Sequence, residues 1–450
     1  MTMYGLDRLR ARLSGDPRLL RVATTAVTSH AGRFGAGIVV LVTIPMARAA
    51  LSPDLFGTWM MLTALLGFFS FADLGIGNGL LNQVTQARAE ADVPRLRRIL
   101  AAGYVCTGAV GTMLAAAWGL WLIASPEPTS VVGRVSAENA PAVLAALTTF
   151  AVLVAINIPA TLVQKAQLGF QQGHWIGIAQ LASSVVTLVA VPCILHEHGP
   201  LFALVLATLG AQTTANLAST WLWLRRRRFF RDTAWRALID GPTLRGLFVT
   251  GGHFLALQLA VAFAFQSDAI VITQTLGQAA YGDFAVVQKL FLFVSMVLSS
   301  ALLGLWPAFG DAIARNDMAW ARRVLLRSLL AAGMFASLVS LLLVVRIDWI
   351  TSHWLKTPFA PPLSLCVTLG VWTVVDALGS VSGNFMNGAN LVRVQVVLAL
   401  AMAAAAFAGK WLLTPVLGPT GAVLATLLAY CAISVPAQVL IYRNVFAARR

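Results

Sequence analysis

Charged residues are scarce in this 450-residue chain, because Asp, Glu, Lys and Arg together make up only 11% of it. Soluble globular domains usually carry about 25% of these residues. Hydrophobic residues make up 58% of the chain, and its mean hydropathy is +0.80. No soluble core could enclose this much apolar side-chain surface. The composition therefore excludes a soluble protein and indicates that the chain is solvated by lipid.

Cysteine is also scarce, and its placement excludes two further classes of protein. No CxxC pair and no pair at metal-ligand spacing occurs among the four residues, which are Cys106, Cys193, Cys366 and Cys431. We therefore expect neither a disulfide framework nor a zinc site, and no cofactor. The first 18 residues are basic and polar, and no small-residue cleavage site follows the first apolar run. We interpret that run as a retained helix and not as a signal peptide.

Apolar runs of about 20 residues recur along the chain, which is typical of transmembrane helices. The predicted fold class is therefore an all-α polytopic membrane protein with about 12 transmembrane helices. Hydropathy and loop signals place the spans at 21–49, 55–84, 97–124, 140–168, 173–196, 200–224, 246–275, 281–310, 320–346, 361–386, 391–415 and 419–442.

The distribution of Lys and Arg predicts the orientation of these spans. If the N-terminus is cytoplasmic, 25 of the 32 basic residues fall on the inside and two, Arg33 and Lys289, fall within spans. The outside then holds five: Arg48, Arg134, Arg346, Lys356 and Lys410. This bias favours an even number of spans with both termini cytoplasmic. The net charge of +15 and the basic run at 225–228 are explained by topology and headgroup contact, so we expect no nucleic acid as a partner.

The two halves of the sequence resemble each other. An offset of 225 residues aligns Gly57 with Gly282 and the pattern D-x4-RR at 92–98 with the same pattern at 317–323. The segment VLATL also occurs twice, at 205–209 and 423–427. A duplication predicts two pseudo-symmetric six-helix bundles, an N-terminal lobe over residues 1–228 and a C-terminal lobe over residues 229–450. Parallel repeats of this kind commonly move about a central substrate cavity.

Ionisable residues within the predicted spans are the candidates for function. A charge at the bilayer centre costs about 2.5–3.5 kcal/mol on insertion scales, so each should face protein or water. We expect five residues to bind an anionic substrate: Arg33, Lys289, His30, His253 and Gln266. Three carboxylates could bind a coupling ion: Asp268, Asp73 and Asp376. The open alternative is that these cations and carboxylates pair with one another and hold helices together.

Small residues and amides alternate in GIGNGLLNQ at 75–83. Glycines allow helices to approach closely within a membrane, and Asn78 and Asn82 can form hydrogen bonds between helices. We therefore expect this segment to anchor its helix within the lobe and to leave Asp73 near the interior.

The segment FADLGIGNGLLNQVTQARAEADVPRLRR at 71–98 resembles the second-helix signature of polysaccharide-export flippases. These proteins belong to the multidrug/oligosaccharidyl-lipid/polysaccharide (MOP) superfamily of exporters, and SPDLFGTW at 52–59 is similar to their first outer loop. The resemblance implies bundles that form a V and alternate their access. It also implies translocation of an oligosaccharide linked to undecaprenyl diphosphate, for synthesis of O-antigen, capsule or exopolysaccharide. Cationic cavity residues such as Arg33 and Lys289 would meet the diphosphate.

The same resemblance implies a bacterial inner (cytoplasmic) membrane protein whose partners are the lipid-linked oligosaccharide, membrane lipid and polysaccharide polymerase machinery. Two alternatives within transport are a multidrug/cation antiporter of the same superfamily and a lipid II flippase. A third is a membrane glycosyltransferase or polymerase. The largest predicted outer loops, 125–139 and 347–360, carry no paired-acid motif, so we expect the protein not to be an enzyme.

Overall fold

The computed structural model of the chain describes residues 17–69, 73, 75–133, 135–227, 240–248, 251, 267–302, 305–355 and 359–447. These residues are mostly helical, and none of them is in a β-strand. The helices are α2 (Pro17–Ala50), α3 (Pro53–Phe69), α4 (Ile76–Ala89), α5 (Val93–Ala124), η1 (Pro128–Val132), α6 (Ala140–Gly169), α7 (His174–His196), α8 (Leu201–Val205), η2 (Leu206–Gly210), α9 (Ala211–Arg227), α11 (Ser267–Leu276), α12 (Gln278–Ala301), α13 (Leu305–Ala314), α14 (Met318–Leu355), α15 (Leu363–Gly388), α16 (Val392–Leu417), α17 (Pro419–Ala429), η4 (Tyr430–Ser434) and α18 (Val435–Ala447).

The predicted class of an all-helical, multi-pass membrane protein is confirmed. Ten stretches of helix within the described residues are long and apolar enough to cross a membrane, and each overlaps one of the twelve predicted spans. Of the other two, the span at 246–275 lies largely outside the described residues. The predicted span at 55–84 is instead two helices, because α3 ends at Phe69 and α4 begins at Ile76. The predicted span at 281–310 is too long, because α12 ends at Ala301 and α13 begins at Leu305.

One predicted outer loop is also corrected by the structure. The predicted ninth span ended at residue 346, but α14 continues as helix to Leu355. Asp348 and His353 therefore lie on a helix and not in a loop. In the other predicted outer loop, residues Pro128–Val132 form the short 3₁₀-helix η1.

The chain divides into two compact units. The first comprises Met1–Thr43, Phe69–Pro128 and Ala142–Leu255, and the second comprises Ile44–Phe68, Thr129–Pro141 and Ala256–Arg450. Helix α2 contributes residues up to Thr43 to the first unit and the residues from Ile44 onward to the second. The predicted division into lobes at residues 228 and 229 stays a prediction.

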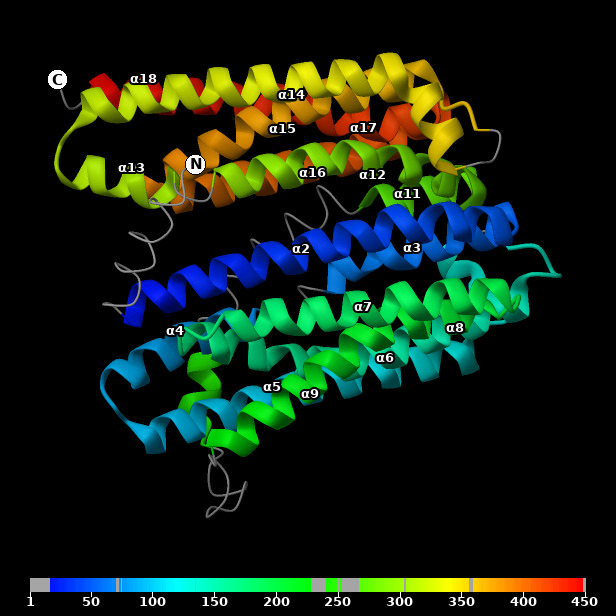
Figure 1. The fold of residues 1–450 in the computed structure, drawn as a ribbon, viewed down its shortest axis with the longest axis horizontal. Coiled ribbons are helices and arrows are strands. Elements are labelled where there is room, and N and C mark those ends of the chain that lie inside the picture. Colours follow the sequence, from blue (N-terminus) through cyan, green and yellow to red (C-terminus); the bar gives the residue numbers. More distant parts are fainter. Residues whose placement is uncertain are drawn as a thin grey trace, which may run out of the picture. The chain divides into compact units, whose positions relative to one another are not determined.

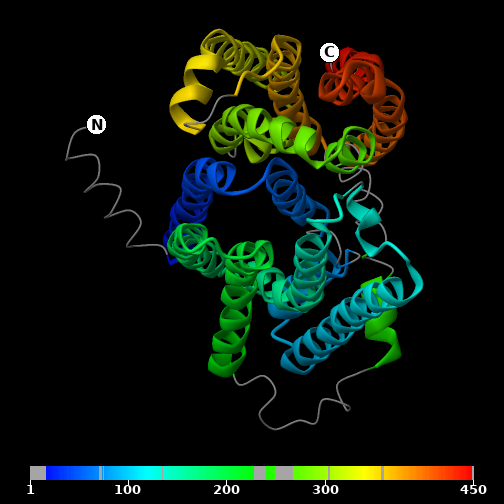
Figure 2. The ribbon, with the colours of Figure 1, turned by 90° about the vertical axis from the view of Figure 1, so that its right-hand side faces the viewer.

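Each unit has a core of its own. In the first, α4, α5, α6 and α9 pack through a cluster that includes Leu80, Leu100 and Val163, with Phe170 against Trp223 at a centroid distance of 5.3 Å. In the second, α13, α14, α15 and α18 pack around Phe309 and Phe385. Figure 1 shows α14 alongside α15, and Figure 2 shows the helices of this unit end-on.

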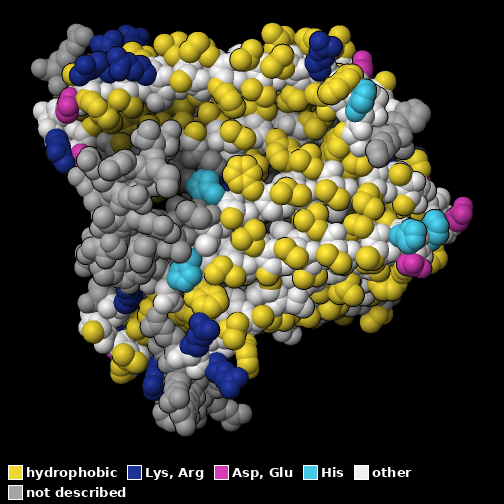
Figure 3. Space-filling view, viewed as in Figure 1, with side chains coloured by type: hydrophobic (Ala, Val, Ile, Leu, Met, Phe, Trp, Pro, Cys, Tyr) yellow, Lys and Arg dark blue, Asp and Glu magenta, His cyan; other side chains and the backbone are white. Residues whose placement is uncertain are grey.

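The outer surface of α14 has the side-chain distribution expected of a helix in lipid. Large apolar side chains are exposed along its length, at Leu326, Leu330, Met334, Leu338, Leu341, Leu342, Val345 and Trp349. Basic side chains gather near its N-terminal end, at Arg322, Arg323 and Arg327. Figure 3 shows hydrophobic side chains covering the length of this helix, with Lys and Arg side chains near its ends. A water-soluble helix would not leave so continuous an apolar face uncovered.

The repeated D-x4-RR pattern forms the same local structure in both units. The Asp92 side chain accepts a hydrogen bond from the Arg95 backbone N–H (2.8 Å) and caps α5. The Asp317 side chain accepts one from the Trp320 backbone N–H (3.0 Å) at the start of α14. The residue before each aspartate has a positive φ, 55° at Ala91 and 59° at Asn316. The same turn and N-cap at the same offset support a duplication of the chain.

The aligned glycines, Gly57 and Gly282, meet at a close helix crossing within the second unit. A Cβ added at Gly282 would lie 3.0 Å from the Gly57 Cα and 2.9 Å from the Phe56 Cδ1. A Cβ added at Gly57 would overlap the backbone carbonyl of Gln278. Small residues at such contacts let membrane helices approach backbone to backbone.

We predict that Gly57→Ala destabilises the protein, since the added methyl group can fit only if the α3 and α12 backbones move apart. Overpacking of this kind costs about 1–3 kcal/mol. The measurement is the thermal unfolding midpoint of the protein purified in detergent. Gly108→Ala in α5 is the matched control, because no heavy atom lies within 4 Å of a Cβ added there. Equal midpoints for the two variants would contradict the close crossing.

Candidate functional site

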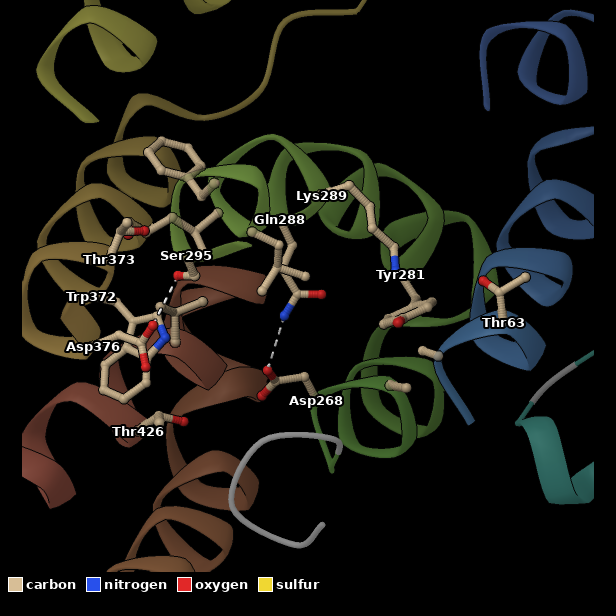
Figure 4. Close-up of a pocket in the computed structure, with 16 residues that line it drawn as sticks. Thr63, Asp268, Tyr281, Gln288, Lys289, Ser295, Trp372, Thr373, Asp376 and Thr426 are labelled. Atoms are coloured by element: carbon tan, nitrogen blue, oxygen red, sulfur yellow. Dashed lines mark hydrogen bonds between the residues drawn. The ribbon is translucent and has the colours of Figure 1, made fainter. Parts of the chain in front are cut away.

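A cavity of about 400 Å³ lies within the second unit, between α3, α11, α12, α15 and α17. Figure 4 shows the side chains that line it, which include both carboxylate and ammonium groups. Its polar and ionisable lining residues are Thr63, Asp268, Tyr281, Gln288, Lys289, Ser295, Trp372, Thr373, Asp376 and Thr426. The cavity therefore brings together three residues selected from the sequence: Asp268, Lys289 and Asp376.

Asp268 lies in the first turn of α11 and is only 8% exposed. Its Oδ1 is 2.7 Å from Nζ of Lys410, a residue of α16 whose side chain is completely buried. The Lys410 ammonium also donates a hydrogen bond to the Ser267 hydroxyl (3.1 Å). Opposite charges in this arrangement compensate one another where water is scarce. The prediction that Lys410 lies in an outer loop is wrong, because its charge lies inside the protein.

Asp376, on α15, has a different environment. Its Oδ2 accepts a hydrogen bond from the Ser295 hydroxyl of α12 at 2.9 Å. Within the part of the chain that the structure describes, no salt bridge involves this carboxylate. Asp376 is therefore stabilised by a neutral donor and not by a fixed cation.

Lys289 is the only Lys or Arg among the 16 residues that line the cavity. It is half-buried on α12, one position after Gln288, whose amide donates to the Asp268 Oδ2 at 3.5 Å. Figure 4 shows the Lys289 amine directed toward Tyr281 and the Gln288 amide directed toward Asp268. No salt bridge holds the Lys289 ammonium among the described residues, so it is available to an anion.

The remaining substrate-binding candidates are not in this cavity. Arg33 and His30 lie on α2 within the first unit, where Arg33 is exposed and His30 is half-buried. His253 and Gln266 lie outside the described residues. A shared substrate site that includes Arg33 and Lys289 stays a prediction.

Asp73 lies in the first unit and is engaged by backbone groups. Its two carboxylate oxygens accept hydrogen bonds from the Gly75 and Gly77 N–H groups, each at 3.0 Å, at the start of α4. Gly75 has φ of 75°, and a Cβ added at Gly77 would overlap the Asp73 carboxylate. The glycines of GIGN therefore allow the chain to turn tightly around Asp73. The N-cap residue of α4 is Gly75, and the Asp73 carboxylate accepts the N–H groups at the helix start as a capping side chain would.

Asn78 follows Gly77 in α4 and joins this helix to α6. Its side-chain oxygen accepts a hydrogen bond from the Lys165 ammonium of α6 at 2.8 Å. The expected polar contact between helices is thus present at Asn78. The Asn82 side chain lies outside what the structure describes.

Sequence reasoning missed an amide network in the first unit. Asn216 of α9 donates to Asn157 of α6 (2.9 Å) and accepts from Gln164 (2.9 Å) and Gln212 (3.2 Å), and Ser183 of α7 donates to Gln212 (3.0 Å). Three membrane helices are joined by these uncharged contacts. The partners are up to 59 residues apart in sequence, so only the repeated occurrence of amides in apolar helices could have indicated the network.

Comparisons with known proteins identify the family of the chain. A family profile described as "Polysaccharide biosynthesis protein" matches residues 22–313. A Salmonella typhi protein named "Putative O-antigen transporter" is 22% identical over 352 residues, which cover 76% of this chain and 77% of that protein.

Solved structures of MOP superfamily transporters share the fold. An inward-facing multidrug resistance transporter of the MATE family superimposes with a TM-score of 0.73 at 13% identity, over 96% of this chain and 99% of that one. An outward-facing MATE transporter gives a TM-score of 0.64 at 14% identity, over 97% and 98% of the two chains. A Pyrococcus furiosus MOP transporter, described by "reverse polarity of binding pocket", gives 0.63 at 13% identity, over 97% of each chain.

We predict that Asp73→Ala lowers the thermal unfolding midpoint, since it removes the hydrogen bonds to Gly75, the N-cap of α4, and to Gly77 in its first turn. Loss of an N-cap costs about 0.5–2 kcal/mol. Asp73→Asn should lose less, because its amide oxygen still accepts one backbone N–H. The control is Asp311→Ala, which removes an exposed ion pair with Arg315 and should change stability little. If Asp73→Ala and Asp311→Ala unfold at the same temperature, the capping role is refuted.

Proposed function

Because this chain belongs to the polysaccharide biosynthesis protein family and has the fold of MOP superfamily transporters, we propose that it is a flippase for a lipid-linked oligosaccharide. The substrate is an oligosaccharide on a polyprenyl diphosphate of the undecaprenyl type. The protein moves it from the cytoplasmic to the outer leaflet of the bacterial inner membrane, with both of its own termini cytoplasmic. The glycan then joins O-antigen, capsule or exopolysaccharide through the polymerase machinery.

The observation that carries this proposal is the Lys289 ammonium, which no salt bridge holds among the described residues, in a cavity inside a unit of membrane-spanning helices. A diphosphate headgroup cannot enter hydrocarbon unaided, because an uncompensated ion in a medium of low dielectric constant costs tens of kcal/mol by Born solvation. An ammonium group donates charge-assisted hydrogen bonds to phosphate oxygens. Hydroxyl and amide groups beside it, from Thr63 and Gln288, match the neutral hydroxyl groups of a sugar.

The mechanism follows from this chemistry. The headgroup enters a hydrated cavity that contains Lys289, and the polyprenyl tail stays in lipid. Lys289 and Arg33 neutralise part of the diphosphate charge, while His30, His253 and Gln266 bind the remaining polar groups. The lobes then rock, and the cavity opens to the outside. The coupling ion binds at one of the carboxylates Asp268, Asp73 and Asp376.

The cavity carboxylates favour one alternative, a multidrug/cation antiporter. Asp268 and Asp376 are acidic groups in a cavity that also contains the aromatic residues Tyr281 and Trp372, which suits an organic cation. A deletion strain separates the two functions. Loss of surface polysaccharide supports the flippase, and unchanged polysaccharide with increased sensitivity to cationic drugs supports the antiporter.

We predict that Lys289→Ala and Arg33→Ala each abolish surface polysaccharide while leaving the protein in the membrane, because each removes a cation that binds the diphosphate. Lys289→Arg should retain export, since it keeps the charge. The readout is surface polysaccharide in a deletion strain complemented with each variant, beside the amount of protein in the membrane fraction.

The matched control for these variants is Arg346→Ala, which removes an exposed arginine of α14 that does not line the cavity. It should export at the wild-type level. Normal surface polysaccharide in both the Lys289→Ala and Arg33→Ala strains would contradict the proposed charge role.

A further inference from the structure

The two carboxylates of the cavity differ in how their charge is compensated. Asp268 faces the fully buried Lys410 ammonium at 2.7 Å, with the Gln288 amide on its other oxygen at 3.5 Å. Asp376 has the Ser295 hydroxyl at 2.9 Å. One carboxylate is therefore held by a cation that belongs to the protein, and the other by a neutral group.

The Lys410 ammonium stays beside Asp268 because it is part of α16. Its Nζ also donates to the hydroxyl of Ser267, the residue before Asp268 in α11. Two neighbouring side chains of α11 therefore hold the Lys410 ammonium in place. A cation from solution would have to displace this ammonium to bind Asp268. A proton on Asp268 would leave the buried ammonium without its counter-charge, which is strongly unfavourable. Asp268 thus has its cation already.

Asp376 is the carboxylate left to exchange an ion. The charged and titratable groups that share its cavity are Lys289 and Tyr281 of α12 and Asp268 of α11. Lys410 of α16 lies behind Asp268, and Tyr430 of η4 packs against Trp372, which also lines the cavity. Lys410 is engaged by Asp268, and Lys289 is the group that the proposed function assigns to the diphosphate. When a proton binds an oxygen of Asp376, the carboxyl becomes neutral and its bond from Ser295 weakens, because that bond is stronger to an ionised acceptor.

We propose that Lys410 is a tethered counter-cation that keeps Asp268 ionised throughout transport, and that Asp376 is the cavity carboxylate that takes up and releases a coupling proton. This inference rests on the proposed flippase function and names the coupling group of the same site. A proton enters from the outside water, forms one O–H bond on Asp376 and leaves to the cytoplasmic water. Protonation of Asp376 weakens the hydrogen bond that its carboxylate accepts from Ser295. That hydrogen bond joins α15 to α12, the helix that carries Lys289.

The test uses the purified full-length protein in liposomes with a lipid-linked oligosaccharide. Translocation is measured with and without an imposed inward proton gradient. Lys410→Met and Asp268→Asn each leave one buried charge without its partner, so each should reduce folded protein or transport about tenfold or more. The double variant Asp268→Asn/Lys410→Met removes both charges. It should recover to within about threefold of wild type and keep its response to the gradient.

Asp376→Asn should insert normally and transport at one rate regardless of the gradient, whereas Asp376→Glu should retain the response. Ser295→Ala provides a second test that keeps the carboxylate. It should weaken the response to the gradient, because protonation of Asp376 then no longer alters a contact between α15 and α12.

Three results would overturn the inference: a folded double variant that no longer responds to the gradient, an Asp376→Asn variant that still responds, or a wild-type protein that transports with no response at all. A wild-type protein that folds but does not move the oligosaccharide would refute the proposed function itself.

Discussion

A charge placed among apolar helices must be compensated by a partner or by water, and this constraint explains most of the polar chemistry of the chain. Three carboxylates that look alike in sequence are compensated in three ways. Two backbone N–H groups hold Asp73, the Lys410 ammonium holds Asp268, and the Ser295 hydroxyl holds Asp376. The first is part of a helix start, the second is part of an ion pair, and the third is left free to change its charge. Burial alone does not distinguish these roles, whereas the identity of the partner does.

The scaffold around these groups depends on small residues and caps that recur in both halves. Gly57 and Gly282 let two helices cross closely within the second unit, and Asp92 and Asp317 start equivalent helices after equivalent turns. The aspartate caps satisfy backbone N–H groups within their own segment, as lipid requires of a helix. The glycines let neighbouring membrane helices pack backbone to backbone. The cavity lies between helices held in this way, so Lys289 and Asp376 project from rigid elements.

Sequence reasoning was strongest where a signal is summed over many residues. Ten of the twelve predicted spans match apolar helices in the described residues, because hydropathy averages over about 20 positions. It failed at single residues. The turn at Asp73 and Gly75 was hidden in an apolar run, although the same glycines were noted as packing residues. Lys410 was counted with the outer loops even though it falls within the predicted span 391–415, because its partner Asp268 is 142 positions away in the sequence and no local pattern joins them. The amide network around Asn216 was missed for the same reason.

The central claim is that this family member carries a charged glycolipid headgroup across the membrane through a cavity in which Lys289 is the available cation. The most direct measurement reconstitutes the purified protein with a fluorescent polyprenyl-diphosphate oligosaccharide and follows how much of it a membrane-impermeant lectin can reach. The account predicts that the accessible fraction changes with time only in liposomes that contain the protein, and that added inorganic diphosphate slows the change. Transport that is equally fast for a neutral polyprenyl glycan without the diphosphate would contradict it.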